Sequence, residues 1–293
     1  MRTQNKGIII YLLTAFGMAW TLWAIPLRID VPTHNLLLQL ATRPLAGLPG
    51  GMAPAVAAIV VRKWVTREGF ADAGLAWHLR GKWPYYFFAW LWPLGVTLVI
   101  AILATTLGIG QPDFALQRAH QMTAAEVSAS SPISSHPTLI VLVELLAIAL
   151  VSTPILWGEE FGWRGYLQVR LLSDRPLLAA VVTGLIWGVW HYPFFFLPAY
   201  HQGVDQPALA LIIFPISTTL MSVILGWFRQ RTGSVWAASL AHAAANAIGA
   251  NLMALWFTSD SHWLWWSYLG VLGWVPLGAL CGWIILGGRL EKR

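Results

Sequence analysis

Apolar stretches of about twenty residues recur along the whole chain, and they restrict what it can fold into. A helix that crosses a bilayer needs roughly 20 mainly apolar residues. Eight stretches reach or approach this length, at about 8–27, 44–61, 84–109, 137–158, 177–199, 207–228, 234–257 and 264–287. The sequence therefore predicts an all-α, polytopic bundle of about eight transmembrane helices.

The composition agrees with a lipid environment and argues against a soluble protein. Charged residues make up 10% of the chain and hydrophobic residues 57%, whereas soluble domains carry roughly 25% charged residues. The 19 tryptophans fit side chains that gather at membrane interfaces. We therefore expect membrane lipids as partners and no nucleic acid, although the net charge is +6.

The basic residues predict the orientation. With the N-terminus inside, 15 of the 18 Lys and Arg residues fall in inside segments, and only Arg28, Arg43 and Arg118 fall outside. Lys and Arg concentrate on the cytoplasmic side of membrane proteins, so both termini are expected in the cytoplasm. The basic connection 62–83 is expected to lie along the inner interface.

The whole chain, 1–293, is expected to be one membrane domain with three parts. Residues 1–136 hold the N-terminal helices and their loops, and 258–293 hold the C-terminal helix and tail. Residues 137–257 are the predicted catalytic core, because the polar cluster falls there. Ionisable groups inside a bilayer cost several kcal/mol unless they are paired or hydrated, so each of them is a candidate functional residue.

The first polar group is Glu159, Glu160 and Arg164. Glu160 and Arg164 are four residues apart, so they share a helix face and can pair. Glu159 points elsewhere without a local counter-charge, and such a carboxylate can act as a base. The alternative is that these residues only mark the cytoplasmic end of the fourth helix. The apolar run that continues to Leu172 favours a longer helix, with Glu159 about 20 Å from its inner end.

Two further polar elements follow at comparable depth. His191 lies four residues after Trp187, and His242 lies four residues before Asn246. A His N–H and an amide NH₂ on one helix face make a donor pair suited to an oxyanion. Each element alone could be a hydrogen bond between helices. Three consecutive elements at similar depth favour one shared site, from which Glu144 is excluded as a packing residue.

The order Glu-Glu-x-x-x-Arg, aromatic-x-x-x-His and His-x-x-x-Asn resembles the CAAX protease and bacteriocin-processing (CPBP) family of intramembrane proteases. The resemblance covers roughly Glu159 to Asn246. It implies that Glu159 and His191 activate a water, that Glu160 and Arg164 support the site, and that His242 and Asn246 stabilise the oxyanion. The family's second motif usually begins with Phe. Trp187 stands there instead, and we expect little consequence from this change.

The resemblance leaves the cofactor open. Glu159, His191 and His242 would supply a zinc set of two His and one carboxylate, but a metal-free, glutamate-dependent mechanism is favoured because Glu160 is expected to be committed to Arg164. The expected substrate is a membrane-associated peptide, which a lipid group can anchor, and the expected location is a bacterial or archaeal plasma membrane. The alternatives are a non-catalytic immunity or scaffold protein and a proton-coupled transporter.

Overall fold

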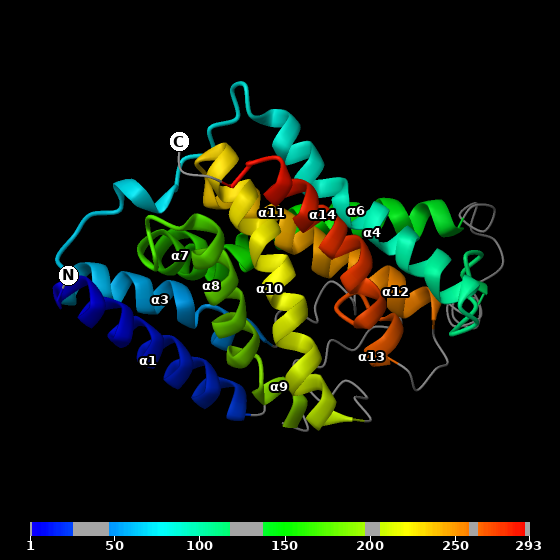
Figure 1. Ribbon diagram of the computed structural model, residues 1–293, viewed down its shortest axis with the longest axis horizontal. Coiled ribbons are helices and arrows are strands. Elements are labelled where there is room, and N and C mark those ends of the chain that lie inside the picture. The colour runs from blue at the N-terminus through cyan, green and yellow to red at the C-terminus, as the bar shows by residue number, and fades with distance from the viewer. Residues whose placement is uncertain (1, 26–46, 118–136, 197–205, 258–262, 291–293) are drawn as a thin grey trace, which may run out of the picture.

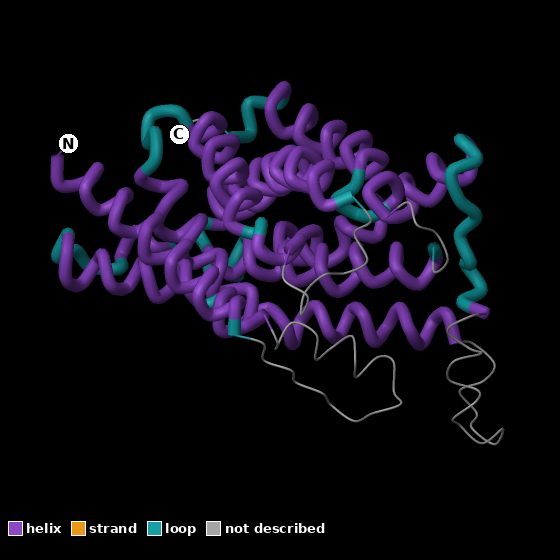
Figure 2. Tube along the Cα trace, turned by 90° about the horizontal axis from the view of Figure 1, so that it is seen from below, coloured by secondary structure: helices purple, strands orange, loops and turns teal. Residues whose placement is uncertain are grey.

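The computed structural model describes residues 2–25, 47–117, 137–196, 206–257 and 263–290. These residues form helices and loops without a strand (Figures 1 and 2). The α-helices are α1 (Arg2–Ala24), α3 (Ala53–Val60), α4 (Trp83–Thr106), α6 (Pro137–Gly162), α7 (Gln168–Arg170), α8 (Pro176–Trp190), α9 (Pro193–Phe196), α10 (Pro207–Thr232), α11 (Val235–Ala244), α12 (Asn251–Trp256), α13 (Trp263–Trp266) and α14 (Trp274–Leu286). The π turns are η1 (Val61–Val65), η4 (Trp163–Leu167) and η5 (Ala245–Ala250), and the 3₁₀ turns are η2 (Ala71–Ala73) and η6 (Val271–Gly273).

The all-α prediction is confirmed for the described residues, whereas the count of eight spanning helices is not. Within the described residues, six helices are long and apolar enough to cross a membrane: Gln4–Ala24, Trp83–Thr106, Thr138–Arg170, Pro176–Phe196, Pro207–Thr232 and Leu264–Leu286. In the described part of the expected stretch 44–61, the helical residues 47–51 are separated by a turn at Met52 from the short α3, which ends in a π turn. The stretch 234–257 is helical but rich in Ala and polar residues.

Two other predictions stay predictions. The three outside arginines that set the orientation, Arg28, Arg43 and Arg118, lie outside the described residues. The division of a single domain at 136/137 and 257/258 is likewise not tested by the helix arrangement.

The fourth predicted helix continues past Arg164, as expected. It runs for 33 residues, from Thr138 to Arg170, and so ends two residues before Leu172. Leu172 has a φ of 50°, a left-handed backbone conformation that a helix cannot include. The π turn η4 interrupts this helix directly at Arg164. Such π turns inside α-helices are frequent at functional sites.

Close helix contacts at glycines position the two helices that carry the first two motifs. In α6, a Cβ on Gly162 would lie 2.6 Å from the backbone carbonyl carbon of Pro54 in α3. In α8, Cβ atoms on Gly184 and Gly188 would lie 2.5 and 2.6 Å from Cα atoms of α10. Small residues spaced four apart let helix backbones approach closely in membranes, and here they fix the positions of the helices that carry Glu159 and His191.

The N-terminal part of the chain also supports the motif helices. Arg62 is fully buried, and its Nη2 donates to the carbonyl of Gly165 within η4 at 3.0 Å. A π turn changes the hydrogen-bond pattern of the backbone, and a side-chain donor stabilises the altered segment. In α1, the indole of Trp20 donates to the carbonyl of Trp190 at 2.9 Å. The predicted core 137–257 is therefore held in place by residues 2–73 as well.

Candidate active site

Glu160 is the centre of a buried charged group that joins two motifs. Its side chain is fully buried, as is that of Arg164. Its Oε1 accepts a hydrogen bond from Arg164 Nη1 at 2.9 Å and contacts His242 Nδ1 at 2.9 Å. The predicted pairing of Glu160 with Arg164 is confirmed. The contact to His242, 82 residues further along the chain, ties α11 to α6.

The contact to Glu160 determines which nitrogen of His242 faces a substrate. A carboxylate oxygen accepts hydrogen bonds, so Nδ1 of His242 carries the proton. A neutral ring then has a lone pair on Nε2, and Nε2 donates only when the ring is doubly protonated. The predicted role of His242 is that of an N–H donor to the oxyanion. Because Nδ1 contacts Glu160, His242 can donate to an oxyanion through Nε2 only when both ring nitrogens carry a proton.

Glu159 is held by Trp187. The indole Nε1 of Trp187 donates to Oε2 of Glu159 at 2.8 Å. The other oxygen, Oε1, accepts no hydrogen bond from the part of the chain that the structure describes. A Cβ placed on Gly51 would lie 3.8 Å from this oxygen, so the segment before α3 passes close to it. Glu159 thus has one oriented oxygen and, within the described residues, one oxygen without a protein donor, as a general base needs.

Trp187 contacts four of the six predicted site residues. Besides contacting Glu159, its ring packs against the guanidinium of Arg164, whose central carbon lies 4.6 Å from the ring centroid. Its ring lies 5.5 Å from that of His191 and 5.0 Å from that of His242. A cation over an indole face is attracted by the ring quadrupole. Trp187 is therefore the common neighbour of all three motifs. The expectation that Trp in place of Phe has little consequence stays a prediction, and the contacts of the indole argue against it.

His191 follows the last residue of α8 and is oriented by its own helix. Its Nδ1 lies 2.9 Å from the carbonyl oxygen of Trp187. A carbonyl only accepts, so Nδ1 is the protonated nitrogen and Nε2 has a free lone pair. The ring lies among aromatic side chains that include Trp23, Phe194 and Phe214. This packing limits the ring's rotation and leaves Nε2 as its basic atom.

Asn246 is not gathered into the group around Trp187. It lies in the π turn η5 and is exposed, whereas His242 is 4% exposed. Within the described ranges its side chain makes no hydrogen bond. The spacing of four residues predicted one shared face for both side chains. The π turn that begins at Ala245 changes the helical register between them, so the two differ in exposure.

The predicted zinc set does not assemble in this arrangement. Among the described residues, no three His, Cys, Asp or Glu side chains lie close enough to share a metal ion. Moreover, Glu159 Oε2 is bonded to Trp187, and Nδ1 of each histidine is already engaged. Glu159, His191 and His242 are arranged around an indole ring instead, and their geometry does not fit a tetrahedral zinc site.

Two contributors to the site were missed in the sequence. Trp187 was noted only as a motif position, although a buried indole N–H needs an acceptor and a carboxylate was predicted at similar depth. Arg62 was assigned to an interfacial connection, and nothing in its neighbourhood indicates burial. Glu144 has a buried Oε2 without a partner among the described residues.

Comparisons with known proteins point to the same region of the chain. Residues 138–248 match the family model of the type II CAAX prenyl endopeptidases, Rce1-like. The matched segment runs from α6 to η5 and contains all six predicted site residues. No curated protein matches the chain. The resemblance to the CPBP family predicted from the three motifs is thereby confirmed.

Proposed function

Since the segment 138–248 that carries the site matches the CAAX prenyl endopeptidase family, we propose that this multi-pass membrane protein is an intramembrane endopeptidase. It hydrolyses a peptide bond of a membrane-associated peptide. One observation carries the proposal. Glu159 has one carboxylate oxygen oriented by an indole N–H and one without a donor among the described residues, in a part of the chain where apolar residues predominate.

In the proposed mechanism, Glu159 acts as the general base. Its carboxylate takes a proton from a water, and the water oxygen attacks the peptide carbonyl carbon. Nε2 of His191 accepts the other hydrogen bond of that water, because its Nδ1 is committed to the carbonyl of Trp187. The proton on Glu159 then passes to the leaving nitrogen as the C–N bond breaks. The products are a carboxylate and an amine.

The negative oxygen of the tetrahedral intermediate requires donors. We assign this role to Nε2 of His242, in its doubly protonated ring. The side-chain amide of Asn246, the second expected donor, is exposed and would have to turn toward His242 to contribute. The Glu160 carboxylate at Nδ1 of His242 orients the ring. The ion pair with Arg164 orients Glu160, and the hydrogen bond from Trp187 orients Glu159. The two neighbouring glutamates therefore point in different directions.

The substrate is proposed to be a lipidated peptide anchored in the same membrane. The name of the matched family, prenyl endopeptidase, supports a prenyl group. The predicted cytoplasmic orientation places the cut on the inner side. A metal-free mechanism accords with the contacts of Glu159, His191 and His242, and the proposed location is a bacterial or archaeal plasma membrane.

The test is cleavage by the purified full chain in proteoliposomes. The substrate is a farnesylated peptide with a C-terminal CAAX sequence, and released peptide is detected by mass spectrometry. The proposal expects a released C-terminal fragment that requires Glu159. Absence of any cut peptide, together with uptake of a solute that depends on a proton gradient and on Glu159, would replace the protease by a transporter.

A further inference from the structure

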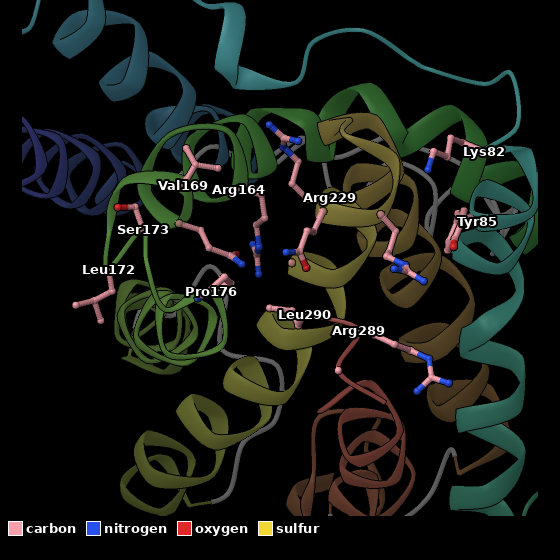
Figure 3. A pocket seen from close by; sticks show the side chains of 15 residues that line it. Lys82, Tyr85, Arg164, Val169, Leu172, Ser173, Pro176, Arg229, Arg289 and Leu290 are labelled. Carbon is pink, nitrogen blue, oxygen red and sulfur yellow. The ribbon is translucent and has the colours of Figure 1, made fainter. Parts of the chain in front are cut away.

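A second, basic pocket lies beside the candidate site, among the ends of several helices (Figure 3). Its volume is about 490 Å³. The walls come from the first turn of α4, from η4 and α7, from the turn before α8, from the last turns of α10 and from the residues after α14. These ends fall in segments that the distribution of basic residues predicts to be cytoplasmic.

The described lining of this pocket has one sign of charge. Five of its residues are cationic and none is acidic, the five being Lys82, Arg164, Arg229, Arg231 and Arg289. Like charges that converge on a partly enclosed space repel one another and attract an anion. Arg229 and Arg231 come from α10 and Arg289 from the chain that follows α14, so separate segments contribute the charge.

Arg164 connects the pocket with the candidate site. One of its nitrogens, Nη1, bonds Glu160, while its Nε and Nη2 are buried and have no described partner. The side chain has no exposed surface. The Nε atoms of Arg229 and Arg231 are also buried without a described partner. Buried donors without acceptors cost free energy, and an anion with several oxygens would supply the missing acceptors.

The nearby acidic groups are already committed. The carboxylate of Asp72 pairs with Arg62 at 2.8 Å and with Arg170 at 2.9 Å. Arg229 reaches only the backbone oxygen of Asp72, also at 2.8 Å. Glu160 is shared by Arg164 and His242. Among the described residues, Asp72 and Glu160 therefore do not cancel the positive charge of the pocket.

We propose that this pocket binds a phosphate-bearing anion. Guanidinium groups recognise phosphate through paired N–H donors. Basic pockets between transmembrane helices on the cytoplasmic side bind anionic lipid headgroups. Either an anionic phospholipid or a soluble phosphate ester presents this chemistry. The inference does not depend on the proposed peptidase activity, because it rests on the pocket and its charges alone.

The test measures ligand binding by native mass spectrometry of the full chain in a non-ionic detergent. The probes are short-chain phosphatidylglycerol, phosphatidylcholine with the same chains, and glycerol 3-phosphate. The proposal expects one phosphatidylglycerol bound in preference to phosphatidylcholine. The double variant Arg231→Gln/Arg289→Gln should weaken this binding about thirty-fold. If glycerol 3-phosphate displaces the bound phosphatidylglycerol, the pocket takes a soluble phosphate ester. If glycerol 3-phosphate does not displace it, the pocket takes a lipid.

A matched control separates the pocket from general surface charge. The double variant Lys63→Gln/Arg175→Gln removes two cations that do not line the pocket and should change the affinity less than about twofold. If the pocket variant does not fold, Lys82→Gln alone should weaken binding about fivefold. Equal losses in pocket and control variants would overturn the proposal. So would displacement by a peptide with a free C-terminal carboxylate, but not by either phosphate compound.

Discussion

The indole Nε1 of Trp187 donates a hydrogen bond to Oε2 of Glu159 at 2.8 Å. An aromatic residue one turn before His191 therefore orients the carboxylate that we propose as the base. Phe, the usual first residue of the family's second motif, has no N–H to donate. In this chain the indole ring also makes a cation–π contact with Arg164. One side chain therefore positions both the proposed base and the cation beside it.

Trp187→Phe removes this N–H and keeps an aromatic ring. A hydrogen bond to a charged group contributes about 1.5–3 kcal/mol, so we expect kcat to fall about tenfold or more with KM nearly unchanged. The measurement is steady-state cleavage in proteoliposomes. The control is Trp90→Phe, which removes an indole bond to the carbonyl of Leu146. If both variants lose activity equally, Trp187 has no particular role in orienting Glu159.

The buried group of Glu160, Arg164 and His242 should be sensitive to the loss of one partner. Glu160→Gln leaves the fully buried Arg164 without its counter-charge, and breaking a buried pair costs about 3–5 kcal/mol. Unfolding in mixed micelles measures this change. The surface pair Asp174–Arg175, both 70% exposed, supplies the comparison, since Asp174→Asn should cost less than about 1 kcal/mol. Similar costs for both variants would contradict the account.

The contact of α6 with α3 predicts a glycine requirement. Gly162→Ala places a Cβ 2.6 Å from the backbone of Pro54, so the helices must separate and Glu159 must move. We expect lower thermal stability and at least a tenfold loss of cleavage, because small displacements of catalytic groups are costly. Gly95→Ala in α4 meets no atom within 4 Å and should be neutral. A Gly162→Ala variant that matches Gly95→Ala would show that the contact does not position the site.

The ion pair between Asp72 and the buried Arg62 should make the free energy of unfolding depend on pH. Burial raises the pKa of Asp72, but the hydrogen bond from Arg62 and the charges of Arg170 and Arg62 lower it more, and the net pKa lies below its usual value. The stabilisation is therefore present above the unfolded-state pKa of about 4 and is lost as pH falls through the lower folded-state value.

Asp72→Asn tests this pH dependence. The wild type should be more stable than the variant near pH 7, by less than about 1 kcal/mol because the carboxylate is half exposed. The difference should shrink below about pH 4. Unfolding measured from pH 3 to pH 7 gives the comparison. A wild-type advantage that grows with acidification would be inconsistent with a lowered pKa.

The sequence predicted the features that follow from local spacing. The helical class and the Glu160–Arg164 pair depend on apolar length and on a separation of four residues within one helix. The continuation of the fourth helix beyond Arg164 followed from the apolar run up to Leu172, although the helix ends at Arg170. In each case the relevant residues are near neighbours along the chain, so the physical constraint is visible in the sequence.

The remaining features depend on contacts between distant residues. The bond from Trp187 to Glu159 spans 28 positions and that from Arg62 to Gly165 spans 103. The π turns η4 and η5 change helical register without any local signal such as Pro. For this reason the spacing of His242 and Asn246 predicted a shared face that the structure does not show. Tertiary packing decides these features, and one sequence does not contain that information explicitly.

The central claim is that Glu159 is the base of a peptide hydrolysis. Its direct test compares Glu159→Gln with Glu144→Gln, since both glutamates lie in α6 and only Glu159 contacts Trp187. Both variants are reconstituted in proteoliposomes, their thermal stabilities are checked to be equal, and both are assayed on the same farnesylated peptide. We predict that Glu159→Gln lowers kcat by about 10²–10⁴-fold, whereas Glu144→Gln cleaves at close to the wild-type rate. Wild-type kcat in a folded Glu159→Gln variant would contradict the account.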